Sequence, residues 1–156
     1  MIVRQPRSLQ LTMGLITDKF FWQALRDNNL VRALVGERIA NPALTYEQED
    51  KWQLPYIVIG LEGVQNGTGS KDEVGEADED TATVTVLCVA ENRDRLATLT
   101  TKARAAIRDA YTTCDWDSIG FEIMDYRMSA DGISLDPERP CCYQTLRYVC
   151  EVAMID

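Results

Sequence analysis

The chain has 156 residues, of which 46% are hydrophobic and 26% are charged, and it carries a net charge of −9 with no histidine. This length and balance suit one domain with a single core and exclude wholesale disorder. No apolar run approaches the 20 residues of a membrane span, and without histidine the commonest general base and metal ligand is missing. We therefore expect a cytosolic protein that is not an enzyme and uses no cofactor and no metal.

The cysteines predict neither a disulfide framework nor a zinc site. They are odd in number and have no CxxC spacing. They are Cys88, Cys114, Cys141, Cys142 and Cys150. We expect all five to be reduced thiols.

The first predicted element is a helix that follows an N-terminal extension over residues 1–16. Thr17 suits an N-cap, and Ile16 and Phe21 occupy the two positions of a hydrophobic staple. The cluster 27–29 breaks or bends the helix, and Gly36 is placed to end it. The remaining chain, 17–156, is predicted to be a single domain.

Two strands and a second helix come next. Residues 55–61 are β-branched and aromatic after an initial proline, which is typical of a strand. Residues 81–90 alternate as a second strand, whose last part is apolar on both faces and is therefore expected to be buried on both sides. Asn92 is the expected cap of an amphipathic helix that runs to about Tyr111.

Two further strands, 121–128 and 142–154, complete the order α-β-β-α-β-β. Neighbouring strands joined by loops favour antiparallel pairing. The sequence thus predicts an α+β fold in which two main helices pack on a mixed, mainly antiparallel four-stranded sheet.

An acidic loop is predicted at 63–80, between the first two strands. With one lysine it holds a net −5 of the chain's −9, and its six acids are Asp72, Glu73, Glu76, Asp78, Glu79 and Asp80. Such a composition favours a mobile segment. Three interpretations stay open: a solvated hairpin tip, a calcium site that lacks EF-hand spacing, or an assembly loop that orders on a partner.

Other charged residues give weaker signals. Asp115 and Asp117 flank Trp116, and a turn explains them as well as acid–base chemistry does. The second helix has a basic side, which in a chain of pI about 4.5 indicates a solvated face rather than a nucleic-acid site. We expect no tight binding of nucleic acid.

The order of these segments resembles the tail terminator (tail completion) proteins of long-tailed phages and prophages. The similarity rests on the helix end at 34–39, the strand opening at 54–59, the strand 83–90 that leads into the alanine-rich helix 94–111, and the last strand at 146–152. It covers most of 18–152. The N-terminal extension and the long acidic loop depart from the compact pattern of the family.

This resemblance implies a homo-oligomer, a hexameric ring that caps the tail tube, ends its polymerisation and offers the head-joining surface. The implied partners are the tail tube and head-connector proteins, with no membrane contact. The implied location is the cytoplasm of the bacterial host and then the virion tail. The alternative is a dimeric ferredoxin-like domain that binds a ligand or regulates, with a sheet face as its interface.

Overall fold

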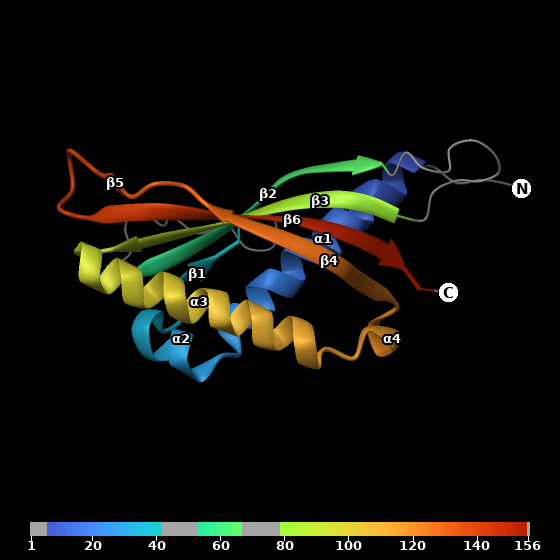
Figure 1. Cartoon of the computed structure of the whole chain (residues 1–156), viewed down its shortest axis with the longest axis horizontal. Helices are drawn as coiled ribbons and strands as arrows, with labels where there is room; N and C mark the ends of the chain where they lie inside the picture. Colours follow the sequence, from blue (N-terminus) through green and yellow to red (C-terminus); the bar gives the residue numbers. More distant parts are fainter. Residues whose placement is uncertain (1–5, 42–52, 67–78, 156) are drawn as a thin grey trace, which may run out of the picture.

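The computed structural model describes residues 6–41, 53–66 and 79–155, and Figure 1 shows a twisted sheet with helices on one of its faces. The helices are α1 (Pro6–Arg26), α2 (Asn29–Val35), α3 (Arg93–Thr113) and α4 (Trp116–Ile119). The strands are β1 (Ile39–Ala40), β2 (Tyr56–Asn66), β3 (Glu79–Ala90), β4 (Phe121–Ala130), β5 (Ser134–Leu135) and β6 (Cys142–Met154).

The sheet is mixed and mainly antiparallel, as predicted, but it has six strands instead of four. Its order is β1-β2-β3-β6-β4, with β5 paired to β6; β1 runs parallel to β2, and every other pair is antiparallel. The two additional strands, β1 and β5, are each two residues long and leave no periodic pattern in the sequence. The four predicted strands are the four long ones.

The first helix begins at Pro6, so the N-cap predicted at Thr17 is wrong. Proline suits the first position of a helix because its missing N–H would have no helical partner there. Thr17 instead lies in mid-helix and is fully buried. The predicted break is confirmed: the Oδ1 atom of Asn28 accepts hydrogen bonds from the backbone N–H of Leu30 and Val31, both at 3.0 Å, and so begins α2.

Glycine ends the short helix α2, as predicted. Gly36 has φ +61°, a conformation that other residues rarely adopt, and its N–H donates to the Arg32 carbonyl. The cap predicted for α3 is also confirmed, because Asn92 Oδ1 accepts from the Arg95 N–H at 2.9 Å.

One main core lies between the sheet and the helices. Phe21 and Leu25 from α1 and Leu99 from α3 are fully buried. The inward side of β3 matches the predicted alternation, and its members are all fully buried: Ala82, Val84, Val86 and Cys88. Burying a large apolar side chain stabilises a fold by about 1.5–3 kcal/mol, so this layer supplies most of the driving force.

Candidate functional site

Most of the predicted acidic assembly loop lies outside the described residues. Asp72, Glu73, Glu76 and Asp78 belong to 67–78, of which the structure describes nothing. The flanking strands extend into the predicted loop from both ends, because β2 continues to Asn66 and β3 already begins at Glu79. The ends of the loop are therefore paired strand, and the prediction that it starts at residue 63 is wrong.

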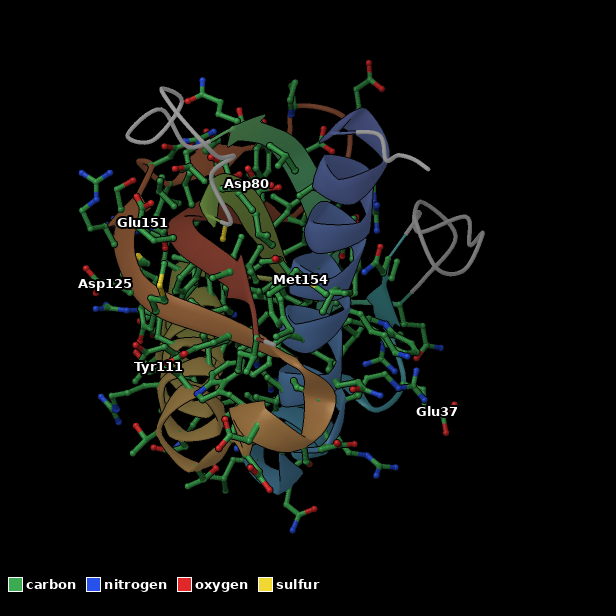
Figure 2. All side chains as sticks on the ribbon, turned by 90° about the vertical axis from the view of Figure 1, so that its right-hand side faces the viewer. Glu37, Asp80, Tyr111, Asp125, Glu151 and Met154 are labelled. Atoms are coloured by element: carbon green, nitrogen blue, oxygen red, sulfur yellow. The ribbon has the colours of Figure 1, made fainter. Side chains whose placement is uncertain are left out.

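Asp80 is part of β3 and only 3% exposed, which corrects its place on a solvated tip. In the ladder it stands opposite Asn66 on one side and Val152 on the other. The neighbouring Thr81 donates from its hydroxyl to Glu151 at 3.2 Å. Figure 2 shows Asp80 and Glu151 near one another, at the end of the sheet where β3 begins.

Only one face of the sheet carries described helices, and the opposite face, here called the open face, has an apolar end. Val89 and Tyr56 are 3% and 6% exposed there, although no described helix covers them. The chain after β5 shields them instead, since Cys141 packs in the same cluster and Arg139 stands 5.9 Å above the Tyr56 ring. The predicted burial of this end of β3 on both sides is thus confirmed at Val89, whereas Leu87 is half-buried.

An ion network crosses the middle of the open face. Arg147 on β6 pairs with Glu62 on β2 at 3.0 Å and with Asp131, just after β4, at 3.2 Å. The hydrogen bond to Glu62, followed by the two negative charges, raises the pKa of Arg147. Because all three side chains are accessible to water, the network fixes side-chain positions more than it stabilises the fold.

An aromatic cluster joins α1, α3 and α4 to β4 and β6. Tyr111 at the end of α3 donates from its hydroxyl to the Met124 carbonyl of β4 at 2.9 Å, and its ring meets Tyr126 edge-on at 5.0 Å. Tyr126 in turn contacts Tyr148, whose pKa is raised chiefly by burial. Trp116 of α4 contacts Phe20 of α1, with ring centres 5.1 Å apart. These contacts hold α3 alongside the outermost strand.

A buried carboxyl lies between α1 and the end of β1. Asp18 is fully buried and accepts a short hydrogen bond from the Nδ2 atom of Asn41 through its Oδ1 atom. Its Oδ2 atom has no partner among the described residues. Burial raises the pKa of Asp18, while the bond from Asn41 acts in the opposite direction. The sequence gives no signal for this site, because the two residues are 23 positions apart.

No group of side chains among the described residues is arranged to hold a metal ion. Asp115 and Asp117 flank the start of α4 on the surface, as a turn would place them. A cavity of about 250 Å³ opens at the beginning of α3 and is lined by Leu34, Pro55, Asp94, Arg95, Thr98 and Leu99. Across the described ranges, no helix has the length and apolarity to span a membrane.

Strand β4 is the structural feature that sequence reasoning did not identify as a candidate site. It forms one margin of the sheet, and no described strand pairs with its outer side. At the other margin, β1 pairs with β2, and α1 packs closely on β2. An uncovered edge presents N–H and C=O groups that can pair with another chain.

No family model matches the chain, and no curated protein matches it. Among solved structures, the chain is similar to a chain of the virion of a native gene transfer agent particle. The TM-score is 0.57 and the sequence identity 15%, over 85% of this chain and 91% of that chain.

A crystal structure from Akkermansia muciniphila gives a TM-score of 0.23 at 13% identity, over 62% of this chain and 43% of that chain. A core domain from the same organism gives 0.21 at 10% identity, over 62% and 47%. Neither of these two carries an argument, whereas the first similarity shows a shared fold.

Proposed function

We propose that this chain is a structural subunit of a phage-like particle, without catalytic activity, that forms a ring on the end of the tail tube. The ring, a hexamer, ends tube polymerisation and offers the surface for head joining. The observation that carries the proposal is the fold shared with a virion chain over 85% of this protein and 91% of that one. Because the match covers most of both chains, it supports a shared domain rather than a shared small substructure.

The shape of the subunit supports assembly into a ring. At one margin of the sheet β1 pairs with Ile57 and Val58 of β2, whereas no described strand pairs with the outer side of β4 at the other margin. When the open side of one subunit meets a different surface of the next, the contact is head to tail, and such contacts produce a closed ring when the rotation between neighbours closes. Two copies of β4 that paired with one another would instead give a twofold dimer.

The charge of the chain agrees with a channel through which DNA passes. At −9 the protein repels phosphate on average, and like charge disfavours contacts that would hold the DNA in place. The partners of such a ring are further copies of the chain, the tail tube and the head connector. It assembles in the cytoplasm of the bacterial host and is then carried in the tail.

The alternative, a ferredoxin-like dimer, has less support. A ferredoxin-like domain follows the order β-α-β-β-α-β. Here the first two long strands, β2 and β3, pair directly with one another, and α3 connects β3 to β4. The open face remains available for a twofold contact, so the alternative is kept as an outcome of the test.

The test is the mass and shape of the purified protein. Light scattering over a concentration series should give about six times the subunit mass of 17.6 kDa, and negative-stain images should show rings with a central hole. Leu99→Asp, which places a charge in the core, serves as the unfolded control and should give no rings. A compact dimer at every concentration would contradict the ring and favour the alternative.

A further inference from the structure

We propose that the outer side of β4, together with the adjoining basic side of α3, is the docking surface for the acidic segment 67–78 of a second copy of this chain. The inference rests on the proposed ring and names the contact between neighbouring subunits. We call this docking surface the β4–α3 surface; its residues are Arg104, Arg108, Met124, Tyr126 and Arg127.

The first part of the argument is the geometry of β4. Nine of its ten residues pair with β6 on one side, with Met124 at an irregularity between Ile123 and Asp125, and no described strand pairs with the other side. Met124 is 37% exposed, and Arg127 points away from the core on the same strand. In Figure 2 the labelled Asp125 marks this strand at the outer margin of the molecule. Apart from the Met124 carbonyl, which accepts from Tyr111, the outer side of β4 can therefore take up an extended segment through backbone hydrogen bonds.

The second part is the helix that flanks this strand. The Tyr111 hydroxyl donates a hydrogen bond to the Met124 carbonyl, so the end of α3 lies directly beside β4. Arg104, Arg108 and Tyr111 are spaced four and three residues apart, so the two exposed arginines lie on the same side of α3 as Tyr111. Burial raises the pKa of the Tyr126 hydroxyl, and the positive charges of Arg108 and Arg104 act against that rise. The floor of the surface is thus aromatic, and its helix side is basic.

The third part is charge. Helix α3 holds five basic and two acidic residues in a chain whose net charge is −9, so its exposed side is a positive region on a negative protein. Among the ion pairs of the described residues, Arg108 makes only a loose one with Asp109, at 3.9 Å with both side chains 68% exposed, and Arg104 and Arg127 make none. These three arginines are available to an acidic partner.

The chain supplies a segment of matching charge. Residues 67–78 contain Asp72, Glu73, Glu76 and Asp78 against a single lysine. The strands on either side of these twelve residues are paired up to Asn66 and from Glu79. Donor and acceptor lie on different strands of the subunit, so a contact between copies can repeat head to tail, as a ring requires.

The test uses two variants of the same helix with the same change of charge. Arg104→Glu with Arg108→Glu reverses the β4–α3 surface, whereas Arg93→Glu with Arg95→Glu reverses two exposed arginines at the far end of α3. The first variant should weaken self-association about tenfold or more, measured by sedimentation at low salt, and the control should associate like the parent. Equal helicity by circular dichroism would show that both variants fold.

A reciprocal variant locates the partner segment. Neutralising the four acids, with Asp72→Asn, Glu73→Gln, Glu76→Gln and Asp78→Asn, should weaken association to a similar degree, and salt should then have little further effect. Combining Arg104→Glu and Arg108→Glu with Asp72→Lys and Glu76→Lys in one chain should restore association. Because the readout is self-association, its recovery when both charges are exchanged would show that the acidic segment and the arginines meet between copies.

The outcomes separate this inference from the proposed ring. If the variant with Arg104→Glu and Arg108→Glu forms rings as well as the parent does, the docking surface is refuted and the proposed ring is still supported. Self-association that depends on these arginines but yields dimers without a central hole supports the surface and overturns the ring. If the parent is a monomer throughout, or if the arginines are needed only to bind a duplex DNA probe, the docking surface is refuted.

Discussion

The contact between α1 and β2 gives a sharp test of the packing, because a single glycine permits it. A Cβ atom built on Gly14 would lie 2.6 Å from Cγ2 of Val64 and 2.9 Å from a Cδ atom of Leu61, both on β2. Real Cβ atoms do not approach other atoms so closely. The Leu61 methyl group can swing away, but a β-branched valine on a strand has little rotamer freedom. Val64 therefore decides what a larger residue costs.

Two effects of opposite sign determine the result for Gly14→Ala. Alanine in place of glycine inside a helix stabilises by about 1 kcal/mol. Forcing one extra methyl group into a packed site costs roughly 1–3 kcal/mol. We expect the packing term to be the larger, so that Gly14→Ala lowers the free energy of unfolding by about 1 kcal/mol.

Urea unfolding, followed by tryptophan fluorescence and circular dichroism, gives the required free energies. Ala97→Gly, on the exposed side of α3, measures helix propensity alone and should cost about 1 kcal/mol. In a double-mutant cycle, Val64→Ala should relieve the strain, so the double variant should be more stable than the sum of the single changes by about 1 kcal/mol. If Gly14→Ala stabilises the protein by the full helix term and the cycle is additive, the close contact does not exist.

Two further predictions concern the core and the buried carboxyl. Leu99→Ala should lower the free energy of unfolding by about 2–5 kcal/mol, because Leu99 is fully buried in the main core; a loss below 1 kcal/mol in urea unfolding would contradict that position. Burial raises the pKa of Asp18 in the folded state. The free energy of unfolding therefore falls as the pH rises from about 4, the unfolded pKa, through the folded pKa. At lower pH the carboxyl is protonated in both states and has no such effect. Asp18→Asn should therefore be more stable than the parent at pH 7, with a difference that shrinks toward pH 4, and a difference independent of pH would refute the assignment.

Local signals in the sequence predicted the elements whose ends are fixed by neighbouring residues. Asn92 caps α3, Asn28 begins α2 and Gly36 ends it, and each acts through atoms within four positions along the chain. The alternation in β3 likewise reports which side chains face the core, because the period of a strand is two. These features depend on short-range geometry and can be read without the rest of the fold.

The predictions were wrong where contacts between residues far apart in the sequence determine the structure. Thr17 has the side chain of an N-cap, but it lies in mid-helix because α1 begins at Pro6 and packs along β2. Asp80 belongs by composition to a solvated loop, yet pairing with β2 and β6 continues past it, so it is strand and nearly buried. Asp18 and Asn41 meet only because β1 runs beside α1. None of these contacts has a counterpart in local spacing.

The lateral order of the strands has the largest consequence for function, and sequence order does not determine it. With four long strands in the order β2, β3, β4, β6, simple neighbour pairing would put the last strand at the margin. In the fold, the chain passes from β3 through α3 to β4, and β6 then returns between the two. The margin of the sheet is therefore β4, the strand beside the basic side of α3. If β6 were outermost, its edge would lie away from Arg104 and Arg108, and the charge of α3 would have no open strand next to it. An unpaired strand edge thus lies beside the basic side of α3 because β6 pairs between β3 and β4. This arrangement makes the β4–α3 surface a testable interface.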